Sequence, residues 1–471
     1  MSGLAAALTR PYGLNLKFTS DRHTMNTPTK LSALLSTGFL LAACGNSGHS
    51  DGSKSISASE ITTTAIKVEV IETATGYQLL RDGEPYHIKG AGIDDGDYER
   101  FALHGGNSLR TWYTGGGDRS GQEVLDQAHA LGLTVSMTIG MGAEHWGFDY
   151  GDEEAVAEQF ERAREAVLQY KDHPALLTWF IGNELNYDYE DPRVFDAINE
   201  VSMMIHELDP NHPTSTTLAG YDTNAIADIQ TRAPDLDFIS IQAYGSLVLL
   251  PEWFERDNFT MPYFITEWGA VGHWEVAQTE WSAPIEQNSS MKAANYLRSY
   301  NEVIAPFPDQ GLGNYVFLWG QKQERTPTWY GMFAPTGEET ETIDVMHYIW
   351  NGVWPENRTP AIESMHLNAL TAYDNVTLDA GATYNAEVIA IDAESDPLTY
   401  FWELRNESTS TKSGGAEEYI PDVIEGRIEN ADGSQIQLRT PEEEGAYRLF
   451  VYVYDGNDHA AHANVPFYVN N

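Results

Sequence analysis

The chain has 471 residues and a net charge of −43, with 70 Asp and Glu residues against 27 Lys and Arg. So large a negative charge repels nucleic-acid phosphates and anionic lipid headgroups, so we expect no nucleic-acid partner and no direct binding to an anionic membrane. The length and the 42% hydrophobic content suit one barrel-sized domain plus a smaller one.

The first predicted segment is an apolar stretch that ends at the only cysteine, Cys44. From Met25, the run M-N-T-P-T-K supplies a basic residue, and L-S-A-L-L-S-T-G-F-L-L-A-A-C follows it. This resembles a bacterial lipoprotein signal in which L-A-A-C is the lipobox. The resemblance implies that Cys44 is lipidated and that translation starts at Met25. A transmembrane anchor is the alternative, but the stretch is short of the roughly 20 apolar residues that span a bilayer.

Residues 1–44 are therefore assigned to a lipoprotein signal region, and residues 45–60, rich in Gly and Ser, to a flexible linker. This arrangement predicts a cell-envelope protein, lipid-anchored to a bacterial membrane, on its periplasmic or cell-surface side. Its membrane contact is expected only through the anchor. Next, K-V-E-V-I-E-T and Y-Q-L-L-R flank turn residues within 67–86 and predict a β-hairpin.

Residues 61–358, which include the hairpin, alternate short apolar β-rich runs with longer helical patterns. The stretches 153–170 and 192–208 repeat apolar residues every three or four positions, as helices do. Eight such units predict an α/β fold, a (β/α)8 TIM barrel with its active site at the carboxyl ends of the strands. An open, doubly wound sheet is the alternative. The eight β-rich runs begin at His87, Asn107, Thr134, Leu176, Ser215, Phe238, Tyr263 and Asn314.

The composition changes at W-P-E-N-R-T-P-A-I, and residues 359–471 replace the helical period with alternating strands. They predict an all-β antiparallel sandwich. The segments D-A-E-S-D-P-L-T-Y-F-W and V-Y-V-Y-D-G-N-D resemble immunoglobulin-like modules of the polycystic-kidney-disease or cadherin-like type. Their acidic residues favour either a structural calcium site or ordinary turns, and no other metal or cofactor is expected. These residues are Asp392, Asp396, Asp455 and Asp458.

Two barrel runs carry a glutamate at their end: W-F-I-G-N-E ends in Glu184, and Y-F-I-T-E-W-G contains Glu267. These runs are the fourth and seventh predicted strands, whose ends face each other across a barrel mouth. Hydrolysis of a glycosidic bond needs two carboxyl groups, one to protonate the leaving oxygen and one to attack the anomeric carbon. In a retaining enzyme they lie about 5–5.5 Å apart. The pair therefore predicts a glycosidase.

Asn-Glu at the end of strand 4 and a Glu at the end of strand 7 resemble clan A of the glycoside hydrolases, which retain anomeric configuration. The resemblance implies that Glu184 is the general acid/base and Glu267 the nucleophile. It also implies three supporting strand-end residues: Arg110 near the nucleophile, Tyr244 donating a hydrogen bond to it, and Trp319 under the scissile sugar.

Further residues are expected to bind substrate. Asn183 is placed to hydrogen-bond the sugar 2-hydroxyl. Glu184 must carry a proton near neutral pH, so we expect its pKa to be raised. Aromatic rings near the strand ends suit stacking on sugar faces, and amides suit hydroxyl groups, although any of them can instead pack beneath a loop. These candidates are Trp112, His145, Trp146, Trp268, Trp274, Gln321, Gln323 and Trp329.

The tail F-L-W-G-Q-K-Q-E-R-T-P-T-W-Y-G-M-F and the two-part layout look most like glycoside hydrolase family 158, which contains endo-β-1,3-glucanases acting on laminarin-type glucans. Family 2 barrels are near relatives, but there is no room before His87 for a large N-terminal sandwich, which argues against a family 2 β-galactosidase. The prediction is a retaining endo-β-1,3-glucanase acting on a neutral polysaccharide or oligosaccharide. Alternatives are a β-glucan transglycosylase, an exo-acting β-glycosidase and a non-catalytic glycan-binding lipoprotein. The sequence does not assign an oligomeric state.

Overall fold

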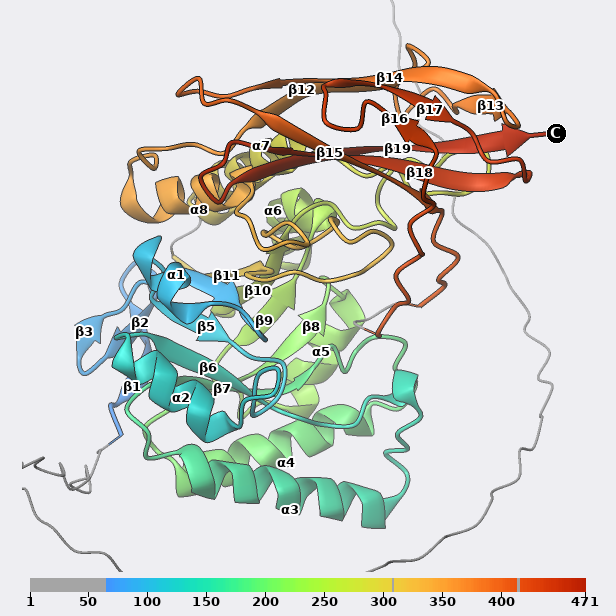
Figure 1. The fold of residues 1–471 in the computed structure, drawn as a ribbon. Helices are drawn as coiled ribbons and strands as arrows, with labels where there is room; N and C mark the ends of the chain where they lie inside the picture. The colour runs from blue at the N-terminus through green and yellow to red at the C-terminus, as the bar shows by residue number, and fades with distance from the viewer. Residues whose placement is uncertain (1–64, 307–308, 413–415) are drawn as a thin grey trace, which may run out of the picture. The chain divides into compact units, whose positions relative to one another are not determined.

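The computed structural model describes residues 65–306, 309–412 and 416–471 (Figure 1). The predicted signal region, Cys44 and the linker lie outside the described residues. The part of the chain from Thr62 to Asn471 forms one compact unit, so the domain boundary placed after residue 358 stays a prediction. Among the described residues, no helix combines the length and hydrophobicity needed to cross a bilayer.

The predicted hairpin is present and gains a third strand. β1 (Val68–Thr73) pairs antiparallel with β2 (Gly76–Arg81), which pairs with the short β3 (Glu84–Pro85). Val68 and Leu79 of this sheet pack against residues at the starts of barrel strands, such as Phe264 and Leu312. The hairpin therefore covers the end of the barrel at which the strands begin.

Eight parallel strands close into a barrel in the order β10-β11-β4-β5-β6-β7-β8-β9. Each of the eight predicted runs overlaps one of them, although β8 and β11 begin before the runs predicted from Ser215 and Asn314. The TIM-barrel prediction is therefore confirmed and the open sheet is excluded. The strands are β4 (Gly90–Gly92), β5 (Ser108–Arg110), β6 (Thr134–Ile139), β7 (Leu176–Asn183), β8 (Thr214–Ala219), β9 (Ile239–Gln242), β10 (Tyr263–Gly269) and β11 (Gly311–Phe317).

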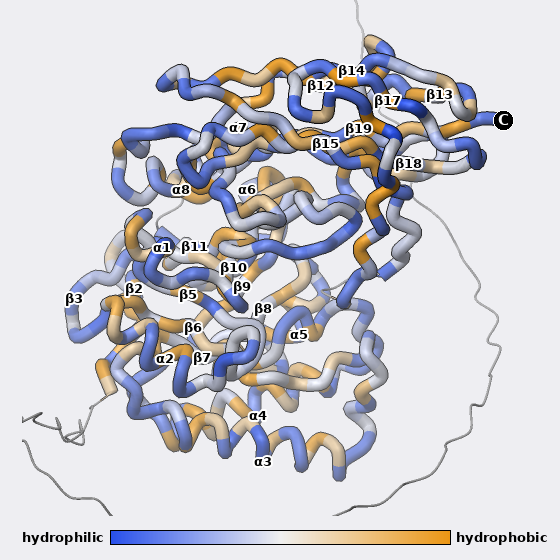
Figure 2. Tube along the Cα trace, viewed as in Figure 1, coloured by the Kyte–Doolittle hydropathy of each residue, from blue (hydrophilic) through white to orange (hydrophobic). Residues whose placement is uncertain are grey.

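Helices surround the barrel, and their sequence patterns explain their limits. Asp152 accepts hydrogen bonds from the backbone N–H groups of Glu154 and Ala155 and so caps α3. Figure 2 shows hydrophilic and hydrophobic residues alternating along α3 and α4, as expected for helices with one face on the barrel. The helices are α1 (Tyr98–Leu103), α2 (Gly121–Ala130), α3 (Glu153–Tyr170), α4 (Arg193–Leu208), α5 (Thr223–Arg232), α6 (Leu250–Asp257), α7 (Ser289–Ser299) and α8 (Glu341–Asn351), with shorter turns η1 (Glu144–Trp146), η2 (Gly245–Leu249) and η3 (Tyr300–Ile304).

After α8 the chain forms two four-stranded sheets around one apolar core, which confirms the predicted all-β sandwich. Most pairs are antiparallel, and β13 with β19 is the parallel exception among the described pairs of these sheets. One sheet contains β12 (Ala361–Leu367), β14 (Thr383–Ile391), β17 (Gln435–Arg439) and β16 (Ile428–Glu429), and the other contains β13 (Thr377–Asp379), β19 (Ala460–Asn470), β18 (Gly445–Tyr454) and β15 (Thr399–Asn406).

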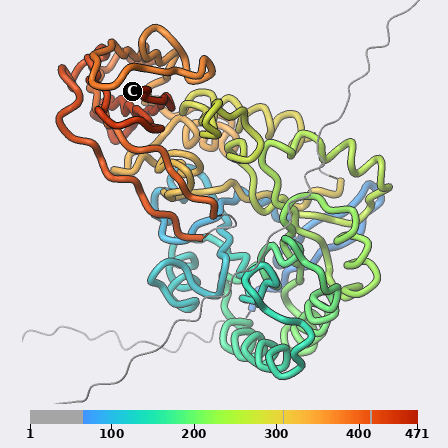
Figure 3. The backbone as a smooth tube through the Cα atoms, turned by 90° about the vertical axis from the view of Figure 1, so that its right-hand side faces the viewer, coloured from blue at the N-terminus to red at the C-terminus, as the bar shows by residue number. Residues whose placement is uncertain are grey.

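The sheets are fastened to the barrel by polar contacts. The backbone N–H of His462 donates to Ser289 Oγ at the start of α7, at 3.1 Å. Arg448 on β18 donates to the backbone oxygen of Pro284 at 2.8 Å. In Figure 3 the segment between β15 and β16 also runs from the sheets toward the barrel. Barrel and sheets thus share an interface that includes buried polar groups.

Candidate active site

The barrel carries a cavity of about 1080 Å³, and both predicted catalytic carboxyl groups line it. Glu184 follows directly after β7, and Glu267 lies near the end of β10. The two strands are separated by β8 and β9 on one side of the closed barrel. The topology therefore brings together two glutamates that are far apart in the sequence.

Glu184 adopts an uncommon backbone conformation. Its φ is 53°, in the left-handed region that non-glycine residues seldom occupy. The backbone N–H of Glu184 donates to Thr217 on β8 at 2.9 Å, and its carbonyl accepts from Tyr187 at 2.9 Å. These contacts stabilise a sharp turn at the strand end, a type of strain that is common at functional sites.

Three donors hold the carboxylate of Glu267. Arg110 Nη1 lies 3.0 Å and Trp112 Nε1 2.7 Å from Oε1, while the Tyr244 hydroxyl donates to Oε2 at 2.5 Å. Glu267 is only 5% exposed and the Arg110 side chain is fully buried. Such charge-assisted hydrogen bonds fix the orientation of a carboxylate. Glu267 is thus an oriented carboxylate at the cavity wall.

Three hydrogen bonds to its amide oxygen fix the orientation of the Asn183 side chain. That oxygen accepts from Arg110 Nη2 at 2.8 Å, from Gln242 Nε2 at 2.8 Å and from Thr217 Oγ1 at 3.1 Å. The amide nitrogen is therefore the end that Asn183 offers to a ligand in the cavity. An amide nitrogen in this orientation can donate to a sugar hydroxyl, as predicted for Asn183.

Glu184 differs electrostatically from Glu267. Burial, and then the negative charge of Glu267, raise the pKa of Glu184 to about 8, although Arg110 and Lys322 act in the opposite direction. A group with this pKa is mostly protonated at neutral pH. The cavity thus pairs one protonated carboxyl with one ionised carboxylate, and the direction of the shift agrees with the sequence-based expectation.

A polar unit that the sequence did not single out lies on the same cavity wall. Lys322 Nζ is 2.7 Å from Glu324 Oε2, and His273 Nε2 is 3.4 Å from Glu324 Oε1. Burial alone would raise the pKa of Glu324, but the hydrogen bond from His273 and the charge of Lys322 hold it below its usual value. All three residues sit in loops after barrel strands. This position is the one feature of the sequence from which they could have been predicted.

Glu275 also lines the cavity but has a structural role. Its carboxylate accepts the backbone N–H groups of Gly245 at 2.7 Å, Ser246 at 2.8 Å and Gly272 at 2.8 Å. It ties the loop after β10 to the loop after β9. We therefore assign Glu275 to loop support and not to the reacting pair.

Several aromatic rings reach the cavity with exposed faces. Trp146 is 62% exposed and Trp274 58%, and both were expected from the sequence. Tyr113 and Tyr187 line the cavity as well, although they are not among the residues predicted from the sequence. Of the remaining candidates, Trp112 and Gln321 line the cavity, whereas His145 and Gln323 do not.

The structure does not bring three predicted tryptophans to the cavity, because each is buried outside its lining. Trp268 donates from Nε1 to Asn314 Oδ1 at 3.1 Å, and Trp329 donates to the Val271 carbonyl at 2.9 Å. Trp319 donates to the Asp97 carbonyl at 3.2 Å and packs edge-on against Phe101 and beside Trp350. Phe317 lines the cavity where Trp319 was expected.

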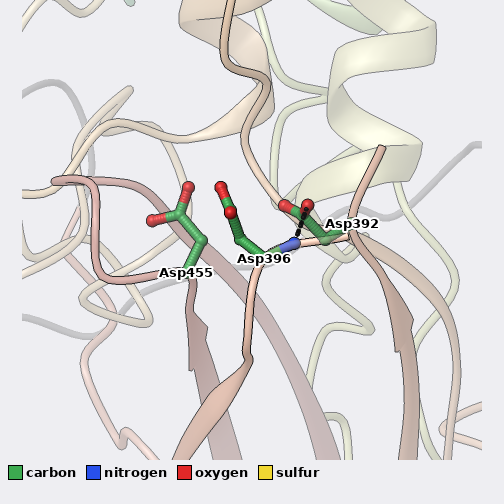
Figure 4. A group of neighbouring side chains, drawn as sticks. All are labelled: Asp392, Asp396 and Asp455. Carbon is green, nitrogen blue, oxygen red and sulfur yellow. Dashed lines mark hydrogen bonds between the residues drawn. The ribbon is translucent and has the colours of Figure 1, made fainter. Parts of the chain in front are cut away.

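The acidic cluster expected in the sandwich is partly assembled. Asp392, Asp396 and Asp455 place oxygens within 4.8 Å of one another (Figure 4), whereas Asp458 is not part of this group. Asp392 accepts the backbone N–H of Asp396 at 2.7 Å, and Asp455 accepts that of Asn457 at 2.7 Å. These are turn contacts, and a structural calcium ion remains a prediction.

A profile described as glycosyl hydrolases family 2, TIM barrel domain, matches residues 107–363, more than half of the chain. An Arabidopsis thaliana protein named for mannan endo-1,4-β-mannosidase activity is 28% identical over 134 residues, which cover 25% of this chain and 33% of that protein.

Solved structures of similar fold include the β-glucuronidase of Bifidobacterium dentium complexed with coumarin-3-O-glucuronide, at 18% identity and a TM-score of 0.48, covering 61% of this chain and 49% of that one. The β-galacturonidase of Eisenbergiella tayi bound to galacturonate has 17% identity and a TM-score of 0.47, covering 61% and 55%. The chain thus spans about half the length of these enzymes. At such identity and overlap, the likeness carries no conclusion about substrate.

Proposed function

The chain belongs to the glycosyl hydrolases of family 2, through their TIM barrel domain, and from that premise we propose that it is a retaining endo-β-1,3-glucanase acting on a neutral glucan. The observation that supports this most strongly is the unequal carboxyl pair. Glu184, whose pKa is raised to about 8, shares one cavity with Glu267, which three donors hold as a carboxylate. Double displacement requires such a pair, in which one carboxyl group donates a proton and the other attacks as a carboxylate.

In the first step Glu184 transfers its proton to the oxygen that bridges two sugars. A carboxylate oxygen of Glu267 attacks the anomeric carbon, the bond to the bridging oxygen breaks, and an ester between the sugar and Glu267 forms. Arg110, Trp112 and Tyr244 orient Glu267 for this attack.

In the second step Glu184, now ionised, removes a proton from water. The hydroxide oxygen bonds to the anomeric carbon, and the ester to Glu267 breaks, which restores both carboxyl groups and retains the anomeric configuration. Asn183, through its amide nitrogen, holds the 2-hydroxyl of the sugar in both steps.

Neutral substrates fit the charges of the cavity better than uronic acids do. Among the described residues that line it, Lys322 is the one lysine or arginine, and Glu324 is already paired with it at 2.7 Å. Asp94 and Asp95 add further negative charge to the wall. A sugar carboxylate would therefore lack a free cation to bind and would be repelled.

An endo-acting mode fits the distribution of aromatic rings. Trp146 follows β6, Tyr187 follows β7 and Trp274 follows β10, so exposed rings line the cavity from several strand-end loops. Stacking surfaces in separate loops suit successive rings of a chain more than a single terminal sugar. The cavity of about 1080 Å³ also has room for more than one ring.

The test is incubation of the purified chain with laminarin, curdlan, mixed-linkage glucan, cellulose, mannan and a glucuronoside. We expect oligosaccharide ladders from laminarin and no product from the glucuronoside. Single sugars released from chain ends would identify an exo-acting enzyme, and elongated products a transglycosylase. Activity on mannan alone would overturn the assigned linkage, and binding of glucan without cleavage would overturn the enzymatic assignment.

A further inference from the structure

Much of one cavity wall comes from a single loop after β11, residues 320–330, which we call the β11 loop. Gln321, Lys322, Glu324 and Tyr330 of this loop line the cavity. Lys322 and Glu324 both influence the charge state of Glu184. The position of the β11 loop therefore decides the surroundings of the proposed general acid.

The β11 loop reverses direction sharply at Arg325. The backbone of Glu324 and Thr326 pairs in both directions, at 3.1 and 2.7 Å, around an Arg325 whose φ is 60°. A left-handed conformation is unfavourable for an arginine, so surrounding contacts must hold it. Arg325 Nε donates to His273 Nδ1 of the barrel at 3.5 Å, and the other contacts come from the C-terminal part of the chain.

On one side the tip of the loop is held by a segment between β15 and β16, which we call the arm (residues 407–412 and 416–422; Figures 1 and 3). The buried carboxylate of Glu418 accepts the backbone N–H of Arg325 at 2.8 Å and lies 3.4 Å from its guanidinium. The guanidinium also donates to the backbone oxygens of Ser410 and of Lys412, the latter at 3.0 Å.

On the other side the loop is tied to the buried carboxylate of Glu286. The hydroxyl groups of Thr326 and Thr328 donate to it at 2.6 and 2.9 Å. Asn464 on β19 donates to the same carboxylate at 2.6 Å, and Lys292 on α7 neutralises it at 2.5 Å. All five of these side chains are buried. The C-terminal sheets thus reach the β11 loop by two independent routes.

We propose that Glu418 and Asn464 are positioning residues, through which the C-terminal sheets hold the β11 loop so that Lys322 and Glu324 face the general acid. The proposal rests on the glycosidase function above. A fixed loop excludes water from Glu184 and keeps the negative charge of Glu324 near it, and both effects favour the protonated form. Lys322 on the same loop acts in the opposite direction, but its effect is smaller than that of Glu324. The C-terminal sheets would then form part of the catalytic machinery and not a detachable glycan-binding module.

The first test compares Glu418→Ala with Glu417→Ala, an exposed glutamate next to it on the same arm. In Glu418→Ala the loop should loosen, so the alkaline limb of the kcat/KM profile on laminarin should move to lower pH by about half a unit or more. We expect kcat to fall about tenfold with a small change in KM, because the reacting geometry loosens more than substrate binding. Glu417→Ala should match the wild type. Glu418→Gln retains an oxygen for the Arg325 N–H and should restore most of the profile.

Asn464→Ala removes the hydrogen bond to Glu286 and should shift the pH profile in the same direction as Glu418→Ala. If Glu418→Ala does not fold, the Asn464→Ala variant alone tests the proposal. Hydrogen exchange in peptides covering 320–330 gives a readout independent of activity, and it should quicken in both variants but not in Glu417→Ala. An inactive wild type would refute the proposed function, whereas an active one with unchanged variants would refute this inference. Unfolding of both variants would assign the contacts a purely structural role and would also overturn it.

Discussion

Strand register decides which residues reach the cavity, and β10 illustrates this at two adjacent positions. Glu267 lines the cavity, while Trp268 points the other way and packs against Tyr296 and Tyr300. Neighbouring residues of a strand face opposite sides, so both could not be substrate contacts. The sequence located the strand end correctly, but only the barrel geometry separates inward from outward residues.

The same limit explains which site residues could be predicted. Glu184, Glu267, Arg110 and Tyr244 meet because strand ends converge, and strand ends can be recognised in the sequence. His273 and Glu324 approach each other across two long loops, whose paths depend on contacts with distant segments. No local pattern encodes such a meeting, so these residues were missed.

The pH dependence follows from the charges around Glu184. This group works as an acid only while protonated, so kcat/KM should fall as pH rises through about 8. Glu324→Gln removes a negative charge that raises the pKa of Glu184, so the alkaline limb should move to lower pH. Lys322→Met removes a positive charge that lowers it, so the limb should move to higher pH. Shifts of about half a unit are expected in pH–rate profiles.

These two variants control for each other, because both break the Lys322–Glu324 pair at 2.7 Å. If either substitution merely disrupted the structure of the cavity wall, the pH–rate profiles of both variants would shift in the same direction. Opposite shifts are expected only if charge at a distance acts on Glu184. Identical or absent shifts would contradict this account of the general acid.

Among the larger elements, the strands of the sandwich differ in burial pattern. The runs in β14 and β17 alternate between buried and exposed residues, which is the pattern from which the sequence predicts alternating strands. Nearly all residues of β18 and of the long β19 are buried, so alternation is absent there. One face of β19 packs in the sandwich core, while Asn464 and His462 contact the barrel. A strand covered on both faces loses the period that reveals it.

The ion pair between α7 and the sandwich should matter for stability. Lys292→Met leaves the carboxylate of Glu286 buried without its cation, which we expect to lower the free energy of unfolding by about 3–5 kcal/mol. In the wild type, Lys292 and the other partners of Glu286 hold its pKa at about 2 against the effect of burial. Without Lys292 the carboxyl group either stays charged and unpaired or takes up a proton, and both outcomes cost stability at neutral pH. Chemical denaturation at neutral pH measures the change.

The double variant Glu286→Gln with Lys292→Met is the matched control. It removes both charges together, so it should recover part of the stability lost in the single variant. A single variant within about 1 kcal/mol of the wild type would show that the pair is dispensable.

Across the whole molecule, family and substrate are separate questions. The barrel belongs to family 2, although the motifs after β11 resemble family 158. The β-1,3 linkage stays a prediction, because it rests on loop motifs and not on the carboxyl pair. A barrel tolerates large changes in its loops, so fold and family constrain the reaction more than the substrate.

We also propose that the molecule is anchored to a bacterial membrane through Cys44, which lies outside the described residues. In a bacterial host, Cys44→Ala should lose labelled palmitate and move from the membrane fraction to the soluble fraction. Its activity per molecule should stay unchanged, since the anchor precedes the barrel. The neighbouring Ser47→Ala should behave as the wild type. Retention of Cys44→Ala in the membrane fraction would contradict the lipoprotein assignment.

In the proposed mechanism Glu267 forms a covalent bond to the sugar. A 2-deoxy-2-fluoroglucosyl fluoride slows hydrolysis of the ester, so the sugar accumulates on the enzyme and peptide mass spectrometry can locate it. We expect one sugar per chain, attached to Glu267. A label on any other residue, or turnover of the reagent with no covalent adduct, would contradict it.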